Sequence, residues 1–202
     1  MKIRGTKMTT ILAGAFALAL AAAPFAHADS YTVDPAHSTV LFKIRHLFTN
    51  VTGTFKSFDG KITFDEKQPQ KSEVSGSIDT VSIDTGVTKR DEHLRSPEFF
   101  DAAKHPKITF KSAGVSDVDS SGKKGKVKGT LAMHGIEKPI VLEAAYLGKG
   151  PGMDGKERAG FRGTTTVNRK DFGLAWNKAI EAGGMMLGDD VTIEIDVEGV
   201  KE

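Results

Sequence analysis

Alternation of apolar and polar side chains is the feature that most limits what this chain can fold into. The stretch VTIEIDVE, residues 191–198, places valine or isoleucine at every second position, with threonine or an acidic residue between them. Successive side chains of a strand point to opposite faces, so this pattern gives one buried face and one face in water. The stretch STVLFKIRH, residues 38–46, repeats it with Val40, Phe42 and Ile44. Such strands are typical of an antiparallel sheet that is covered on one face only.

About eight or nine segments of this kind follow one another, separated by turn residues. Glycine is frequent, with 22 in the chain, and Gly53, Gly76, Gly129 and Gly163 lie inside strand patterns. A glycine inside a strand marks a bend or a close approach of backbones, which a strongly curved sheet requires. No alternation of strands with helices is visible, so a parallel sheet is not expected. The residues therefore predict an all-β domain, either a sandwich or an up-and-down barrel.

Two segments interrupt the alternation and are predicted to contain short helices, near 88–103 and at 175–182. In the first, Asp84 or Thr85 is expected to cap a helix, and Arg90 and Asp91 are expected to bond each other or backbone groups. The second follows Phe172-Gly173-Leu174 and contains the only tryptophan of the chain. Both segments combine charges with aromatic or methionine side chains, a composition that suits elements lying across the end of a barrel.

The first 28 residues read as a signal peptide. Three basic residues among the first seven precede an apolar run at 8–23, and Ala26-His27-Ala28 forms a small-residue cleavage site. We predict cleavage after Ala28, a periplasmic location, and a single domain over 29–202.

Charge and cysteine content exclude two classes of function. The chain has 28 basic and 26 acidic residues; three basic residues leave with the signal peptide, so the mature chain has 25 against 26 and a net charge of −1. A domain so close to neutrality does not predict a nucleic-acid partner. The chain has no cysteine, so disulfides and thiol chemistry are excluded.

Catalytic and metal motifs are weak. No histidine falls in an HxH or HExxH pattern, and no serine lies in a GxSxG turn. His93 and His105 are the pair that tertiary contact could bring together around a metal. An exported enzyme acting on a hydrophobic substrate, with His93, His105 or His134 paired to Asp91, is the alternative function. We assign no catalytic residue and no metal ligand from the sequence.

Several blocks, taken in order, resemble the YceI-like family of exported bacterial proteins. They are DPAHSTVLFKIRHL, GTFKSFDGKITFD, IDTVSIDTGVTKRDEHLRSPEFFDAAKHPKITFKS, VKGTLAMHGIEKPIVLEA, GFRGTTTVNRKDFGL and GDDVTIEIDVEG, and they cover nearly the whole mature chain. The resemblance implies an extended eight-stranded antiparallel lipocalin-like barrel around an apolar tunnel, and a binding protein that is not an enzyme. It implies no cofactor apart from a bound isoprenoid lipid, either a polyprenyl phosphate or an isoprenoid quinone, held for transport, storage or stress response. A homodimer and transient contact with a membrane are further expectations.

The expected ligand contacts divide into a tunnel wall and a gate. The predicted wall residues are Phe42, Ile44, Phe55, Phe64, Ile78, Phe110, Leu131, Met133, Phe161 and Trp176. The residues predicted to contact a head group or to gate the entrance are Arg90, His93 and Met185. A closed core would use the same apolar residues, so a solid barrel that acts through its surface remains an alternative.

Overall fold

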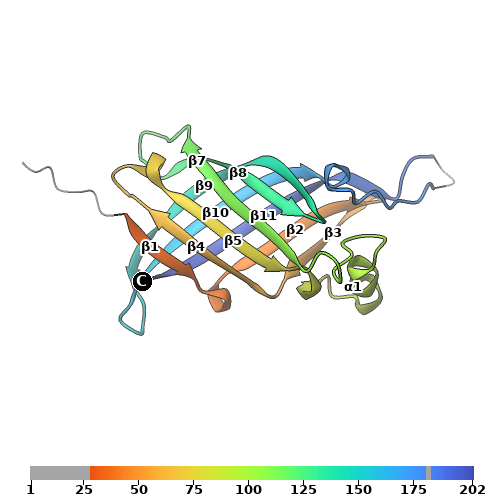
Figure 1. Cartoon of the computed structure of the whole chain (residues 1–202), viewed down its shortest axis with the longest axis horizontal. Helices are drawn as coiled ribbons and strands as arrows, with labels where there is room; N and C mark the ends of the chain where they lie inside the picture. Colours follow the sequence, from red (N-terminus) through yellow and green to blue (C-terminus); the bar gives the residue numbers. More distant parts are fainter. Residues whose placement is uncertain (1–27, 181–182) are drawn as a thin grey trace, which may run out of the picture.

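The computed structural model describes residues 28–180 and 183–202, and their backbone forms an elongated barrel of antiparallel strands (Figure 1). Except for Ala28, the predicted signal peptide lies outside the described residues. No helix in the described ranges is both long and apolar enough to cross a bilayer.

The strands are β1 (Asp29–Val33), β2 (Thr39–His46), β3 (Thr49–Phe55), β4 (Phe58–Phe64), β5 (Glu73–Asp79), β6 (Ile83–Asp84), β7 (Lys107–Ser116), β8 (Lys124–Met133), β9 (Ile136–Pro151), β10 (Glu157–Asn168) and β11 (Leu187–Lys201). The α-helix α1 spans Thr88–Arg95, and short 3-10 turns lie at Pro35–His37, Pro69–Lys71, Thr80–Ser82 and Arg169–Phe172.

The sheet closes on itself through β11. The order β1-β4-β5-β7-β8-β9-β10-β11 forms a ring of eight strands, because β1 also pairs with β11. Along the same side of β11, residues 199–201 pair with β1 and residues 187–196 pair with β2. The pairs β1 with β2, β3 with β4, and β5 with β6 are therefore successive parts of bent strands. The predicted eight-stranded antiparallel barrel is confirmed.

Two interior glycines allow aromatic rings to lie flat against the inner wall. Gly53 is the cross-strand partner of Phe42, and a β-carbon at Gly53 would collide with that ring. At Gly129, a β-carbon would collide with the ring of Phe110. Both are close approaches of the kind predicted for glycines within strands.

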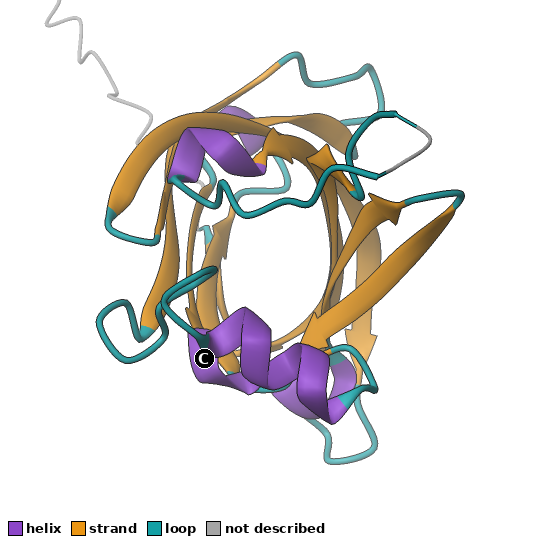
Figure 2. Cartoon of the chain, turned by 90° about the vertical axis from the view of Figure 1, so that its right-hand side faces the viewer, coloured by secondary structure: helices purple, strands orange, loops and turns teal. Residues whose placement is uncertain are grey.

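Connecting segments divide between the two ends of the barrel. The end that we call the terminal end holds the starts of β1 and β10 and the C-terminal end of β11 (Figure 1). The opposite end, the helix end, holds α1, the β2–β3 hairpin and the connection from β10 to β11. Figure 2 views the molecule from the helix end, where α1 and the connecting segments surround the opening of the strand ring.

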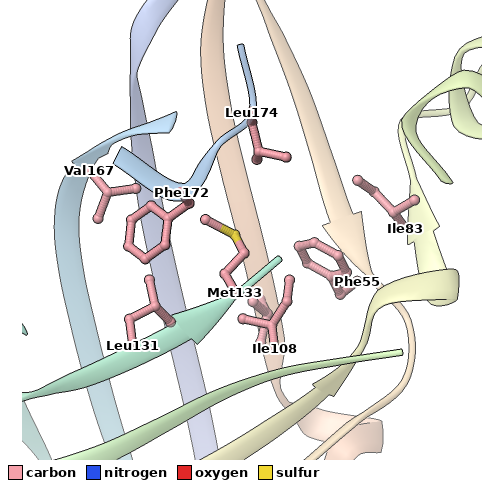
Figure 3. Packing of buried hydrophobic residues seen from close by; sticks show 9 residues of the cluster. Phe55, Ile83, Ile108, Leu131, Met133, Val167, Phe172 and Leu174 are labelled. Carbon is pink, nitrogen blue, oxygen red and sulfur yellow. The ribbon is translucent and has the colours of Figure 1, made fainter. Parts of the chain in front are cut away.

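Apolar packing follows the same division. The larger buried cluster combines strand residues with Phe172 and Leu174 from the β10–β11 connection, which fold inward against Leu131 and Met133 (Figure 3). A second cluster, around Tyr31, Tyr146 and Ala159, is completed by Phe64 and Phe161.

A helix does form within the first predicted segment, near 88–103, but neither Asp84 nor Thr85 caps it. The helix α1 begins after Val87, which makes no side-chain capping bond. The Asp84 carboxylate instead accepts from the Gly86 N–H, at 2.8 Å. Thr85 lies before the helix, and its N–H and hydroxyl both donate to the carboxylate of Asp91 within α1. A buried carboxylate with two donors outweighs the local capping preference.

The second predicted helix, 175–182, is wrong over its described part. Residues 175–180 are not helical, and residues 181–182 lie outside the described ranges. The guanidinium of Arg169 donates to the carbonyls of Leu174 and Trp176. The side chain of Asn177 bonds both backbone groups of Leu187. These tertiary bonds hold the segment extended and override its helical composition.

Candidate functional site

The inside of the barrel holds a cavity of about 510 Å³. Its wall includes Tyr146 and Phe161 at the terminal end and Arg90 and Trp176 at the helix end, so it runs along the barrel. Pockets for small molecules commonly measure roughly 300–1,000 Å³ and are mostly apolar. The interior is therefore open enough to hold a slender apolar guest, which disfavours the solid-core alternative.

The predicted wall residues all lie on this cavity. They are Phe42, Ile44, Phe55, Phe64, Ile78, Phe110, Leu131, Met133, Phe161 and Trp176. Arg90 and His93, predicted for the gate, also line it. Their contact with a ligand stays a prediction.

Met185 is the predicted gate residue that the structure places elsewhere. Its side chain is 49% exposed, and its backbone forms a bridge with Ala179. The next residue, Met186, lines the cavity instead. Adjacent side chains of an extended segment point in opposite directions, so Met186 and not Met185 faces the cavity, and a gate role for Met185 stays a prediction.

The predicted wall included no residue of β11. Val191, Ile193, Ile195 and Val197 all face the cavity. Their strict alternation was visible in the sequence, and it had already identified them as a buried face. The list also omitted Arg169, for which alternation gives no signal because the residue follows the end of β10.

Arg90 brings a positive charge to the cavity wall at the helix end. Its Nε donates to the Thr85 hydroxyl at 2.6 Å, and one Nη donates to the Thr85 carbonyl at 2.8 Å. Thr85 in turn donates to the buried Asp91, so Arg90 and Asp91 bond Thr85 and not each other. Within the described ranges, Arg90 forms no direct salt bridge. Its fixed, half-buried guanidinium is suited to an anionic or carbonyl head group.

Three rings beside Arg90 form what we call the aromatic rim: His93, Phe99 and Trp176. The His93 ring meets Phe99 and Trp176 edge-on, with centroid distances of 4.9 and 5.0 Å. Phe99 and Trp176 are 5.1 Å apart. His93 Nε2 lies 2.5 Å from the exposed carboxylate of Glu98, which fixes the ring orientation. Flat faces and edges of this kind can pack against an unsaturated or ring-shaped guest.

Arg169 holds the segment that carries Trp176. It is 2% exposed, and it donates to the Gly188 and Trp176 carbonyls at 2.9 and 2.8 Å. Burial lowers the pKa of Arg169, and the charge of Asp189 opposes that shift. A buried guanidinium that donates to several carbonyls holds a segment firmly. If the segment moved away, both the buried charge and the carbonyls would lose their hydrogen bonds, at a high cost in free energy.

Phe64, Tyr146 and Phe161 line the cavity at the terminal end, where their rings pack against one another. The centroid of Phe64 lies 4.6 Å from that of Tyr146 and 5.5 Å from that of Phe161. Tyr31 lies edge-on to Phe161, 5.8 Å away, and is 1% exposed. Burial, helped by the charges of Asp29 and Glu157, raises the pKa of Tyr31 to about 12. This ring cluster is therefore apolar and uncharged at neutral pH.

Ion pairs surround these rings. Lys201 contacts Asp29 at 2.8 Å and Glu157 at 3.0 Å. Lys149 contacts Asp29 at 3.5 Å and Glu66 at 3.1 Å. They link β1, β9, β10 and β11 across the closure of the barrel.

The remaining titratable clusters have structural explanations. Asp34, His37 and Glu198 are the single group in the described ranges with metal-like spacing, but Arg158 bridges the two carboxylates at 2.8 and 2.7 Å. A guanidinium in that position already supplies the positive charge that a cation would bring.

The three histidines considered for the enzyme alternative have partners other than Asp91. The rings of His105 and His134 meet edge-on, with centroids 4.8 Å apart, and His134 Nδ1 donates to the Phe172 carbonyl. His93 pairs with Glu98, while Asp91 accepts from Thr85. No described hydrogen bond joins Asp91 to any of the three.

Comparison with known proteins agrees with this architecture. A family model described as the YceI-like domain matches residues 31–199. A UPF0312 protein of Vibrio parahaemolyticus is 38% identical over 198 residues, covering 96% of this chain and 98% of that protein. Protein YceI of Escherichia coli is 37% identical over 196 residues, with the same coverage of both chains.

Solved structures give the same result. A YceI protein of Campylobacter jejuni superposes with a TM-score of 0.67 at 36% identity, over 85% of this chain and 98% of that one. A polyisoprenoid binding domain from Saccharophagus degradans superposes with a TM-score of 0.60, again over 85% and 98%. At 17% identity, that second likeness shows a shared fold. From the family match and from relatives aligned over nearly their full length, this chain belongs to the YceI-like family.

Proposed function

We propose that this protein binds a long isoprenoid amphiphile, either a polyprenyl phosphate or an isoprenoid quinone, in the periplasm. The observation that carries the proposal is the apolar cavity that extends from the terminal-end rings to Arg90 and the aromatic rim. The Saccharophagus degradans barrel with the same fold is named for polyisoprenoid binding, which supports the ligand class. Transport, storage and a part in stress response are all roles that such a binder would fill.

The energy of tail burial explains why the head group matters. Burying a methylene from water gains about 0.8 kcal/mol, so a five-carbon unit gains at most roughly 4 kcal/mol. Several units exceed the roughly 4–15 kcal/mol cost of association. Transfer from a bilayer gains little, however, since the tail is already in hydrocarbon. Selectivity must then come from the fit along the narrow cavity and from Arg90 and the aromatic rim.

Native mass spectrometry of the mature protein, purified from its own host, tests the proposal. We expect a bound species whose mass and fragments, after lipid extraction, identify an isoprenoid amphiphile. The same spectra report whether the protein is the expected homodimer. A cavity that is empty in repeated preparations would overturn the proposal.

A variant that fills the cavity provides the matched test. Gly163 faces the cavity, and a β-carbon there would meet its nearest atom, in Ile195, only at 4.0 Å. Gly163→Phe should therefore fold but exclude the lipid. Thr166, on the same strand, is exposed, so Thr166→Phe should stay loaded. Equal loading of both variants would show that the lipid lies elsewhere.

The head-group contact is tested by Arg90→Gln, with the exposed neighbour Lys89→Gln as control. We expect weaker retention only in Arg90→Gln, by about tenfold, because a charge-assisted bond is lost. Fractionation and N-terminal sequencing test the periplasmic location, with Asp29 as the expected first residue.

A further inference from the structure

The helix end carries a surface of unusual composition, which we call the apolar tip: Phe48 in the β2–β3 turn and Met185 in the β10–β11 connection. Phe48 is 96% exposed and Met185 is 49% exposed. The two segments are joined, since the Leu47 N–H donates to the Met186 carbonyl at 2.9 Å. Figure 1 shows both segments at the helix end.

The turn of the β2–β3 hairpin departs from ordinary turn chemistry. Leu47 has a φ of 49°, a conformation that hairpin turns usually give to glycine, asparagine or aspartate. The turn thus places two large apolar residues where polar ones would be easier to accommodate. Exposed apolar side chains mark a contact surface when they lie together and not singly, and here Phe48 and Met185 lie on two segments that are hydrogen-bonded to each other.

The apolar tip borders the cavity. His46, two residues before Phe48, lines the cavity wall, and so does Met186, which directly follows Met185. Leu187, which pairs with His46, lines it as well. A surface that contacted this tip would therefore face the helix-end part of the cavity.

Positive charges flank the tip. Arg45 is exposed, and its Nε donates to the Leu47 carbonyl at 3.1 Å. Lys178 is exposed, and its carbonyl accepts from the Met186 N–H at 2.8 Å. No carboxylate in the described ranges pairs with either side chain, whereas the nearby Asp189 is occupied by Lys170. Exposed apolar side chains with exposed cations beside them are complementary to an anionic lipid surface.

We propose that the apolar tip docks on an anionic phospholipid bilayer and sets the helix end of the cavity against the membrane. Phe48 and Met185 enter the interfacial region, and Arg45 and Lys178 contact lipid phosphates. A lipid tail then passes between bilayer and cavity with little exposure to water. This inference rests on the proposed function, since it concerns how the lipid reaches the same cavity.

Vesicle flotation of the full mature protein tests the docking. The probes are vesicles of phosphatidylcholine alone and of phosphatidylcholine with phosphatidylglycerol. We expect binding to the mixed vesicles that weakens with salt. The double variant Phe48→Ser, Met185→Ser should bind about tenfold more weakly or less, because the buried apolar area is lost. In Arg45→Gln and Lys178→Gln, each lost charge should weaken binding to the mixed vesicles about fivefold.

The matched control is Met153→Ser, Leu147→Ser, which removes two exposed apolar side chains outside the tip. We expect it to bind vesicles like the unaltered protein. An equal loss in this control, or no binding of the unaltered protein, would overturn the docking. Self-association that disappears only in the tip variant would also overturn it, by showing that a second copy covers the tip.

Lipid content separates this inference from the proposed function. Mass spectrometry of the tip variant should still find the isoprenoid lipid, because neither Phe48 nor Met185 lines the cavity wall. A loaded protein that ignores vesicles would refute the docking alone. An empty protein that binds vesicles would instead refute the proposed function.

Discussion

The two ends of the barrel use similar aromatic residues but hold them by different means. At the terminal end, Tyr31, Phe64, Tyr146 and Phe161 all sit on strands of the closed ring. At the helix end, the aromatic rim sits on α1 and on connecting segments. Rings on a closed sheet move only if the sheet opens, whereas rings on connections can move locally. If the protein binds a guest as proposed, we therefore expect the guest to enter at the helix end, while the terminal end maintains the barrel.

The charged residues at the two ends also play different structural roles. Around the terminal-end rings, Lys201 and Lys149 pair with Asp29, Glu157 and Glu66, and these ion pairs join β1, β9, β10 and β11. At the helix end, Arg169 instead binds backbone carbonyls of the β10–β11 connection and of the start of β11. Each end also has its own optical probe, because both tyrosines lie at the terminal end and the single tryptophan lies at the helix end.

The largest effect is expected from Arg169→Met. The change leaves the carbonyls of Leu174 and Trp176 without their donor in a buried site, at a cost of about 3 kcal/mol in the free energy of unfolding. Trp176 fluorescence should shift to the red while the tyrosine signals stay unchanged. Urea unfolding gives the free energy, and Arg162→Met is the control, because Arg162 is exposed and pairs only with the exposed Asp196.

Equal losses in the Arg162→Met and Arg169→Met variants would break the comparison between the ends. A loss that moves tyrosine and tryptophan signals together would show that the helix end is as integral to the barrel as the terminal end.

An intermediate effect is expected at the terminal end in alkaline solution. The pKa of Tyr31 rises from 10 to about 12 in the folded protein. The unfolded chain therefore loses the proton first, and stability present below pH 10 is lost as pH rises towards 12. Two units correspond to about 2–3 kcal/mol. Urea unfolding at several pH values should show this loss, and Tyr31→Phe should reduce it.

The variant Tyr146→Phe shows how much of the alkaline loss of stability belongs to the second tyrosine of this end. Burial and the charge of Glu66 also raise the pKa of Tyr146, so this variant should remove a smaller part of the alkaline loss. Unchanged alkaline behaviour in Tyr31→Phe would show that the buried phenol does not hold this end together.

Sequence reasoning succeeded where a residue's environment follows from its own strand. Alternation identified Phe42 and Ile44 as one buried face, and both line the cavity. Alternation also predicted about eight or nine strands, but the closed barrel and its tunnel came from the family resemblance, because alternation alone fits a sandwich as well as a barrel. Ring closure depends on β11 pairing with two parts of one bent strand, which short-range patterns do not encode.

The errors lie where distant groups decide the local structure. The helix predicted at 175–182 fails over its described part because Arg169 and Asn177 take over backbone groups of the connection. The same bonds set which methionine turns inward, so Met186 lines the cavity in place of Met185. A prediction made from neighbouring residues cannot include bonds of this kind.

The smallest effect is expected from Glu98→Gln at the helix end. Glu98 is 62% exposed, so its pairing with His93 is worth less than about 1 kcal/mol in stability. The amide keeps the size of the side chain but loses the charge that orients the His93 ring. Global unfolding should therefore stay within error, while release of the bound lipid should become faster, since the rim is held less firmly. Stopped-flow transfer of the lipid to acceptor vesicles measures that rate, with Glu137→Gln, an exposed change away from the cavity wall, as control. If the rate is unchanged while Arg90→Gln alters it, Arg90 and not the aromatic rim controls exit from the helix end.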